Sequence, residues 1–354
     1  MDRWIFHVDI NAFYASVEIN DHPEYEGKAV VVCSDSQRAI ITTANYIARS
    51  YGIESAMPLS IALKKHPNLI ITGLNFDRYR SVSKQFIELC QSYSDKLEQA
   101  SIDECYLDVT IPIKKYKKPL DMAISLQKEI QKKLNLNVSI GIAPNVFLAK
   151  MASNMRKPNG LTIIRENEVP MKLWPLPIEE MHGIGKKTVI LLKAKDINTI
   201  GDLANTKSNQ ISDVFKNHAS EIIDRACGKD DREVESDQQV KSIGNSTSLI
   251  KLTDDPTEIQ IALKSICFDL SSRLKSKELS MKQMTLSIKD EQNQSYARSL
   301  LLDQAIVEAE DIYEQALMIF DDHFNDWAIK NIGVSTNKII DQSFNIQQLS
   351  LFKE

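Results

Sequence analysis

The stretch SIDECYLDV, from Ser101 to Val109, sets two adjacent acids, Asp103 and Glu104, inside an apolar run typical of a buried strand. Successive strand residues point to opposite faces, so the two carboxylates can converge only where the strand turns or bends. At a separation of about 4 Å they would repel each other by roughly 4 kcal/mol at a moderate effective dielectric. The chain must therefore either hold a divalent cation there or leave both acids solvated at a strand end.

A third acid, Asp9, ends another apolar run, RWIFHVDI, and would join the pair if the two strands are neighbours in one sheet. Such a set of oxygen ligands, for which we expect no His or Cys nearby, suits Mg²⁺ or Mn²⁺ better than zinc. Two ions about 3.5–4 Å apart would bind an attacking oxygen and a leaving phosphate oxygen. The pattern favours a two-metal site over three solvated acids.

The composition narrows the class of protein. A chain of 354 residues is long for one hydrophobic core, so we expect two or more domains. Five cysteines without a C-x-x-C pair indicate reduced thiols, and no apolar run has membrane-spanning length. With no visible secretory signal, we expect a cytoplasmic protein without membrane contact. The formal net charge of −5 argues mildly against nucleic acid as a partner.

Strands and helices alternate over the first 165 or so residues without the period of a doubly wound sheet, which predicts an α+β domain. KLEQASIDECYLDVT is expected to form strand, turn and strand. Short helices broken by Pro and Gly follow over about 166–230, and DREVESDQQ is typical of a charged linker. The order β-α-β-β-α-β after the linker predicts a small ferredoxin-like unit.

Three residues have the chemistry to bind phosphate. TANYIAR places Tyr46 and Arg49 on one face of a predicted helix, where a phenol and a guanidinium fork could hold phosphate oxygens. Lys157 precedes a Pro-Asn-Gly turn. Each of these alone would more simply be a surface group.

HGIGKKT carries Gly183 and Gly185 between two predicted helices, followed by Lys186 and Lys187. Glycines in such a hairpin let backbone N–H groups approach a phosphate, and the lysines add positive charge. The pattern predicts a sequence-tolerant helix-hairpin-helix grip on a nucleic-acid backbone, although many helical turns contain Gly-x-Gly.

Taken in order, HVDINAFYASVE, TANYIARSYGI, SIDECYLDV, GIAPNVFLAKMASNMRKPNG and MHGIGKKT resemble successive motifs of the Y-family translesion DNA polymerases, bacterial DNA polymerase IV type. The resemblance runs from about residue 4 to 340. It implies a right-hand polymerase fold whose parts are the palm (1–10 and 76–165), the fingers (11–75), a helical thumb (166–230), a linker (231–240), a ferredoxin-like little finger (241–340) and a tail (341–354).

The resemblance also implies roles for single residues. Asp9, Asp103 and Glu104, with the backbone carbonyl of Ile10, would hold two Mg²⁺ ions, for which Mn²⁺ could substitute. The roles implied for the substrate pocket are triphosphate binding (Tyr46, Arg49, Lys157), exclusion of a ribose 2′-hydroxyl (Tyr14) and a roof over the nascent base pair (Ile40, Thr42). The partners would be primer-template DNA and a dNTP, and the enzyme would act as a monomer.

The chain departs from the family pattern at three positions. Asn11 stands where Asp is frequent, while Val146 and Ser335 replace basic residues near DNA. Residues 240–354 contain about 12 basic and 17 acidic side chains, an unusual balance for a DNA grip. Backbone N–H groups would then carry more of the phosphate contact than side chains do, which predicts a shallow salt dependence of binding.

The tail carries QQLSLF, which resembles the bacterial peptide that binds the sliding clamp. Its contact residues would be Gln348, Leu349, Leu351 and Phe352. Burying each apolar side chain on a partner would contribute about 1.5–3 kcal/mol, although folding back onto the little finger would serve as well. Clamp tethering would raise the local concentration of an enzyme with a weak DNA grip.

Two alternatives to a low-fidelity polymerase remain open. A two-metal nuclease would use the carboxylates but not Tyr14 or the triphosphate set. A catalytically inert DNA-binding scaffold would keep the fold and would not need the acids.

Overall fold

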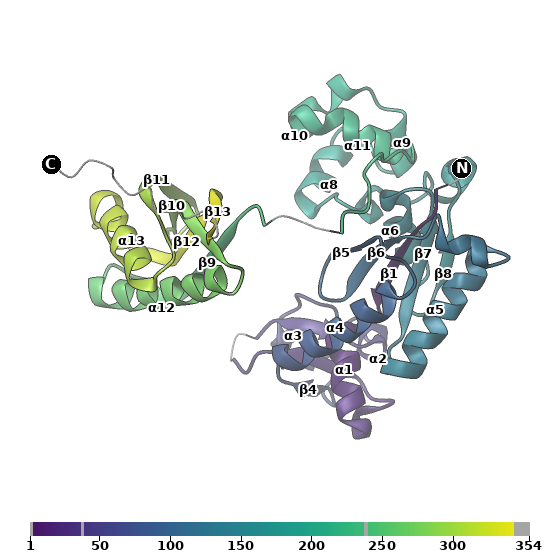
Figure 1. Ribbon diagram of the computed structural model, residues 1–354, viewed down its shortest axis with the longest axis horizontal. Coiled ribbons are helices and arrows are strands. Elements are labelled where there is room, and N and C mark those ends of the chain that lie inside the picture. Colours follow the sequence, from purple (N-terminus) through teal and green to yellow (C-terminus); the bar gives the residue numbers. More distant parts are fainter. Residues whose placement is uncertain (1–2, 37–38, 237–239, 343–354) are drawn as a thin grey trace. The chain divides into compact units, whose positions relative to one another are not determined.

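The computed structural model describes residues 3–36, 39–236 and 240–342 of a chain that divides into two compact units, 1–238 and 239–354 (Figure 1). Each unit has its own hydrophobic core. Both units combine helices with mostly antiparallel sheets, which confirms the expected α+β class.

The strands of the first unit are β1 (Ile5–Ile10), β2 (Val30–Cys33), β3 (Ile41–Ala44), β4 (Ile70–Thr72), β5 (Leu97–Gln99), β6 (Glu104–Asp108), β7 (Val138–Ala143) and β8 (Leu161–Ile163). Its α-helices are α1 (Phe13–Asp21), α2 (Tyr46–Ser50), α3 (Leu59–Lys65), α4 (Phe76–Gln91), α5 (Pro119–Leu134), α6 (Val146–Met155), α7 (Val169–Lys172), α8 (Lys186–Lys193), α9 (Ile200–Ala204), α10 (Ser212–Phe215) and α11 (Ala219–Ala226).

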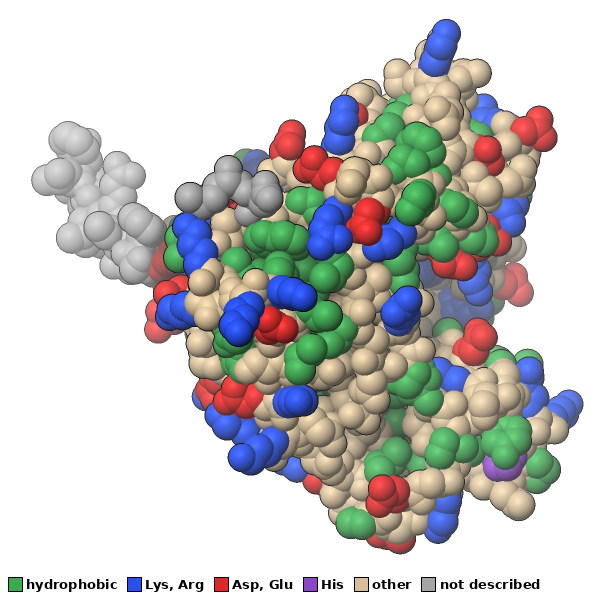
Figure 2. Space-filling model, turned by 90° about the vertical axis from the view of Figure 1, so that its right-hand side faces the viewer, with side chains coloured by type: hydrophobic (Ala, Val, Ile, Leu, Met, Phe, Trp, Pro, Cys, Tyr) green, Lys and Arg blue, Asp and Glu red, His purple; other side chains and the backbone are tan. Residues whose placement is uncertain are grey.

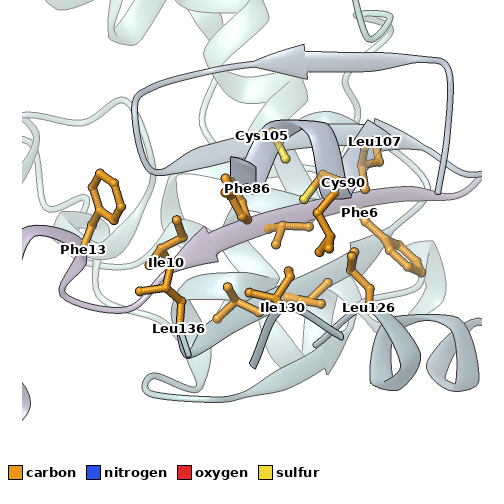
Figure 3. Close-up of a cluster of buried hydrophobic side chains, with 14 of the residues drawn as sticks. Phe6, Ile10, Phe13, Phe86, Cys90, Cys105, Leu107, Leu126, Ile130 and Leu136 are labelled. Carbon is orange, nitrogen blue, oxygen red and sulfur yellow. The ribbon is translucent and has the colours of Figure 1, made fainter. Parts of the chain in front are cut away.

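The main sheet of this unit has the order β5-β6-β1-β7-β8, with β1 antiparallel to both of its neighbours. All six residues of β1 are buried because helices cover both faces of the sheet. On one face, Phe6 and Ile10 pack with Phe86 of α4 and with Leu126 and Ile130 of α5 (Figure 3).

On the opposite face, α6 crosses the sheet in close contact with Gly141 of β7. A Cβ at Gly141 would lie 1.9 Å from the carbonyl oxygen of Ala149 and 2.4 Å from the backbone nitrogen of Ser153. Gly141 is the register partner of His7 in β1. This close approach lays the α6 side chains over the end of β1 that carries Asp9.

Two smaller assemblies complete the unit. β2 pairs antiparallel with β3 and parallel with β4, and a separate small core lies beneath this sheet. The segment α7–α11 shares its core with the α6 face of the main sheet. A capping box starts α9, where Thr199 Oγ1 accepts from Asp202 N and Asp202 Oδ2 accepts from Thr199 N.

The second unit consists of β9 (Ile243–Thr253), α12 (Pro256–Lys275), β10 (Leu279–Lys289), β11 (Ser295–Ile306), α13 (Ala309–Phe324), β12 (Ile329–Thr336) and the short β13 (Ile339–Asp341). The expected β-α-β-β-α-β order is confirmed. The sheet order is β11-β10-β12-β9 with all three pairings antiparallel, so each β-α-β half encloses a strand of the other half. β13 adds to β10 and was not expected.

Both helices of this unit pack on one face of its sheet, against buried residues such as Leu286, Ile288, Ile332 and Val334. Because strand residues alternate, their sequence neighbours point to the other face. The strand registers align mostly small residues there in rows that include one charged residue, Lys289: Gly244, Ser335, Thr285 and Ser299; Ser246, Gly333, Ser287 and Ala297; and Ser248, Asn331, Lys289 and Ser295. This open face is therefore shallow and mostly uncharged.

Candidate active site

A cavity of about 310 Å³ opens beside the C-terminal end of β1. The predicted residues that line it are Asp9, Ile10, Tyr14, Thr42, Tyr46, Arg49, Asp103 and Lys157. They come from positions up to 148 residues apart, and the sheet and its flanking helices bring them together. Ile40 does not line this cavity and is 55% exposed.

The acids converge because the strand bends where the sequence argument requires it. Asp103 lies in a bend before β6, and Glu104 is the first residue of that strand, directly opposite Asp9. The bend is fixed by Ile10 N, which donates to the Asp103 carbonyl at 2.9 Å, and by Ser101 Oγ, which donates to Asp103 Oδ1 at 2.5 Å.

His7 joins the acids, contrary to the expectation that no His lies nearby. Single ligand atoms of His7, Asp9 and Glu104 all lie within 4.8 Å of one another. His7 precedes Asp9 by two residues, so both side chains share one face of β1. This spacing was the signal that the sequence argument overlooked.

The His7 ring is completely buried and Nδ1 lies 2.8 Å from Ser153 Oγ. Its Nε2 is 3.4 Å from Glu104 Oε2 and has no hydrogen-bond partner among the described residues. Burial lowers the pKa of His7 to about 4, so the ring is neutral at pH 7.

Two lysines neutralise part of the acidic cluster. Lys150 Nζ contacts Glu104 Oε2 and lies 3.6 Å from Asp9 Oδ2, while Lys157 Nζ lies 2.7 Å from Asp9 Oδ1. Sequence reasoning missed Lys150, although a lysine inside the apolar helix VFLAKMAS is a signal that it has a buried partner.

The acids therefore differ in their electrostatics. Burial works to raise the pKa of Glu104, but contacts with His7 and Lys150 outweigh it and hold that pKa well below its usual range. Burial raises the pKa of Asp103, and the charges of Asp9 and Glu104 add to the effect. Among the described residues, no Lys, Arg or His lies within ion-pair distance of Asp103. This excess negative charge fits a divalent cation with oxygen ligands.

The predicted phosphate ligands are held firmly. Asn45 caps α2 by accepting a bond from Ala48 N, which sets the helix that carries Tyr46 and Arg49. Arg49 Nε donates to the Ala44 carbonyl at 2.9 Å, and its guanidinium lies 4.7 Å from the centroid of the Tyr46 ring. One edge of the guanidinium is thus occupied before any phosphate binds.

Asn11, the departure beside the acids, supports the turn after Lys157. Its Oδ1 accepts from Asn159 N at 2.8 Å, and its Nδ2 donates to Ser139 Oγ at 3.0 Å. The amide thus fixes the KPNG turn against the main sheet.

The Gly-x-Gly turn lies on the surface. A one-turn 3₁₀ helix (Ile178–Glu180) precedes it and α8 follows. Gly183 has a φ of 93°, and a Cβ at Gly183 or Gly185 would meet no atom within 4 Å. Lys186 and Lys187 are exposed beside it. Nothing in the described chain blocks a ligand from approaching this backbone.

A larger open cleft of about 1570 Å³ lies beside α11 and is lined by several arginines. Two of them are paired with acids, Arg225 with Glu221 and Arg232 with Glu98, both at 2.7 Å. The smaller cavity is the better candidate because it gathers the acids Asp9 and Asp103 with the predicted phosphate-binding residues. The predicted tail residues Gln348, Leu349, Leu351 and Phe352 lie outside the described residues.

The α+β fold, with acids and phosphate-binding side chains in one cavity, suits a nucleotidyltransferase, and comparisons with known proteins identify the class of this chain. Family models match as follows: the impB/mucB/samB family over residues 8–154, the helix-hairpin-helix motif of the same family over 166–197, and the family's C-terminal domain over 240–351.

The chain is 39% identical over 355 aligned residues to DNA polymerase IV 1 of Halalkalibacterium halodurans, covering 99% of this chain and 86% of the relative. It is 37% identical to DNA polymerase IV 1 of Bacillus subtilis, with 99% and 85% covered. Two solved structures are similar at 28% identity and cover 95% of this chain and 99% of theirs. They are a Dbh-Dpo4 chimera of Y-family DNA polymerases (TM-score 0.84) and an insertion ternary complex of Dbh DNA polymerase (TM-score 0.70). The chain belongs to the Y-family DNA polymerases, of the DNA polymerase IV type.

Proposed function

We propose that this DNA polymerase extends a primer 3′ end by two-metal phosphoryl transfer, with low fidelity and with bypass of damaged template bases. The observation that carries the proposal is that Asp9 and Asp103 line one cavity with Tyr46, Arg49 and Lys157, while Glu104 lies directly opposite Asp9 in the adjoining strand. When bound, two Mg²⁺ ions, or Mn²⁺, would favour deprotonation of the attacking hydroxyl and stabilise the negative charge on the leaving phosphate.

The chain's own residues then have distinct tasks. Asp9, Asp103 and Glu104, with the Ile10 carbonyl, hold the metals, and Glu104 keeps its charge because Lys150 contacts it. Among the described residues, Asp103 lacks a cationic partner, so it has most to gain from a metal.

A second set of residues would bind and select the incoming nucleotide. Tyr46 and Arg49 fix the triphosphate, and Lys157 moves from Asp9 to a phosphate oxygen as the site fills. Tyr14 excludes a ribose 2′-hydroxyl by bulk. Thr42 and Ile40 roof the nascent pair, and their modest size leaves room for altered bases.

The proposed subdomains follow the resemblance: palm 1–10 and 76–165, fingers 11–75, thumb 166–230, linker 231–240, little finger 241–340 and tail 341–354. The main sheet would serve as the palm. Partners would be primer-template DNA and a dNTP, in a cytoplasmic monomer. Among the described residues, no helix combines the length and the hydrophobicity that crossing a membrane would need.

Grip on DNA would come mainly from backbone groups. Gly183 and Gly185, with Lys186 and Lys187, offer an accessible turn to a phosphate. The small side chains on the open sheet face of the second unit would let its strands approach the sugar-phosphate backbone closely. On the face of the molecule in Figure 2, Lys and Arg are scattered among acids and apolar groups. We expect a shallow salt dependence of binding.

Primer extension with dNTPs and Mg²⁺ tests the proposal against its alternatives. Lengthening of the primer supports the polymerase, shortening would indicate the nuclease, and DNA retention without either would indicate the inert scaffold. The same assay on a template with a damaged base, and misincorporation measured on an undamaged one, test bypass and fidelity.

A further inference from the structure

The Tyr14 ring is held by aromatic contacts at the floor of the cavity. It stacks on Tyr79 of α4, with centroids 4.3 Å apart and an angle of 19° between the planes. The edge of Phe76 packs against it with centroids 6.1 Å apart. In such a stack, the orientation of the Tyr14 ring depends on how firmly the Tyr79 ring is held.

Tyr79 is fully buried, and its hydroxyl donates to Glu18 Oε1 at 2.6 Å. The other carboxylate oxygen of Glu18 accepts from Thr72 Oγ1 at 3.1 Å. Burial raises the pKa of Tyr79 and the bond to Glu18 raises it further, so the phenol remains a donor. A longer contact, 3.4 Å to the Gly73 carbonyl, is the only other partner of this hydroxyl among the described residues.

Glu18 is a nearly buried carboxylate without a Lys, Arg or His at ion-pair distance in the described chain; 7% of its surface is exposed. Burying such a carboxylate is costly unless it accepts hydrogen bonds. The hydroxyls of Tyr79 and Thr72 that donate to it are therefore fixed in place. Glu18 and Tyr14 are four residues apart in α1 and share a helix face. Tyr79 bridges them, with its ring on one and its hydroxyl on the other.

We propose that Glu18 is a positioning residue for sugar selection, which orients Tyr79 and through it the plane of Tyr14. This inference rests on the proposed role of Tyr14 in excluding ribose. The carboxylate touches neither nucleotide nor metal. It acts by joining α1, α4 and β4, the elements that carry Glu18, Tyr79 and Thr72. A carboxylate that merely filled a polar gap in the core would affect stability but not the choice between sugars.

The test compares Glu18→Leu, which offers the Tyr79 hydroxyl no acceptor, Tyr79→Phe and the double variant with the wild type. Single-turnover kcat/KM is measured for dCTP and rCTP opposite template dG, together with Tm. Tyr14→Ala is the reference for a lost gate. Tyr93→Phe is the matched control, because Tyr93 donates to Glu129 at the same 2.6 Å but, among the described residues, makes no ring contact with Tyr14.

We expect each single variant to lower the dCTP/rCTP ratio by roughly three- to tenfold, the range that one hydrogen bond corresponds to. The change should lie mainly in a higher efficiency with rCTP. The dCTP/rCTP ratio of the double variant should fall no further than that of the more affected single variant, because both substitutions remove the same Tyr79–Glu18 hydrogen bond. Tyr93→Phe should leave the ratio unchanged even if its Tm falls.

Two results would overturn the inference in distinguishable ways. If Tyr14→Ala admits rCTP but Glu18→Leu and Tyr79→Phe keep the wild-type ratio, the Tyr79–Glu18 hydrogen bond does not position Tyr14 and only this inference fails. If Tyr14→Ala also keeps the ratio, the proposed role of Tyr14 fails and the inference fails with it.

Discussion

Asp103→Asn should abolish nucleotide addition and yet stabilise the metal-free protein. Asp103 is the acid of the cluster without a cation at ion-pair distance in the described chain. Burial raises its pKa, and the charges of Asp9 and Glu104 raise it further. Its bond from Ser101 Oγ survives the change, because an amide oxygen also accepts. The substitution thus removes repulsion at almost no cost in contacts.

The magnitude follows from Coulomb's law. Two unit charges about 5 Å apart interact by about 3 kcal/mol at an effective dielectric of 20, and solvent and the nearby lysines reduce this further. We expect a gain of about 1 kcal/mol, or about 2–4 °C in Tm for a unit of this size. Activity should fall by at least about a thousandfold if the carboxylate holds a metal.

The assays are thermal unfolding in EDTA and single-turnover incorporation of a correct dNTP. Asp108→Asn is the matched control, since Asp108 ends the same strand, accepts from Thr110 N at 3.0 Å and lies 4.0 Å from Arg3. It should lose a little stability and keep its activity. Incorporation by Asp103→Asn within tenfold of wild type would refute the metal assignment. A Tm in EDTA below that of the control would refute the electrostatic argument.

Three further outcomes are expected. Gly141→Ala puts a Cβ 1.9 Å from the Ala149 carbonyl, so α6 must move; we expect a loss of about 1–3 kcal/mol and reduced extension, and an unchanged Tm would contradict the packing. Arg78 forks onto Asp21 at 2.7 and 2.8 Å and lowers the pKa of Asp21, so Asp21→Asn should cost less than about 1 kcal/mol at pH 7. The difference in unfolding free energy between wild type and Asp21→Asn, measured by urea unfolding, should vanish as pH falls from about 4 through the lowered pKa. The reason is that Arg78 stabilises only the ionised carboxylate. Truncation after Ile346 should remove clamp-stimulated synthesis and spare unstimulated extension; surviving stimulation with a lower Tm would make the tail structural.

The sequence predicted the meeting of the acids because the relevant physics is local. A buried strand that carries adjacent carboxylates must bend, and the bend before Glu104 is where the structure has it. Asp9 could be assigned to the same cluster because an acid that ends an apolar run is expected at the end of a buried strand. The fold class followed from the order of elements, and β-α-β-β-α-β is the order observed after the linker.

What the sequence concealed depends on contacts across the sheet. Lys150 meets Glu104 only because α6 approaches Gly141 so closely, and nothing in the order of residues fixes where a helix crosses. The two-residue spacing between His7 and Asp9 shows that they share a face of β1. The sequence does not show which face of the sheet the α6 side chains cover. The Glu18–Tyr79 bond joins residues 61 apart, so no local pattern announces it.

The net charge, which argued against a nucleic-acid partner, loses its force once the charges are placed. In the second unit, five of the acids lie on α13, a helix that packs against one side of the sheet: Glu310, Asp311, Glu314, Asp321 and Asp322. On the strands, the register places Lys289 on the open face, whereas Arg298 lies opposite Leu286 on the helix-packed face and Lys251 pairs with Glu258 at 3.2 Å. The net charge of the chain adds up charges that lie at very different distances from a ligand on the open sheet face. Salt screens the charges that lie more than about 8–10 Å away. The field at that face therefore differs from the one that the net charge implies. Substituting acids of α13 with neutral residues should change the net charge strongly and DNA affinity little, whereas Lys289→Gln, on the open face, should weaken binding measurably.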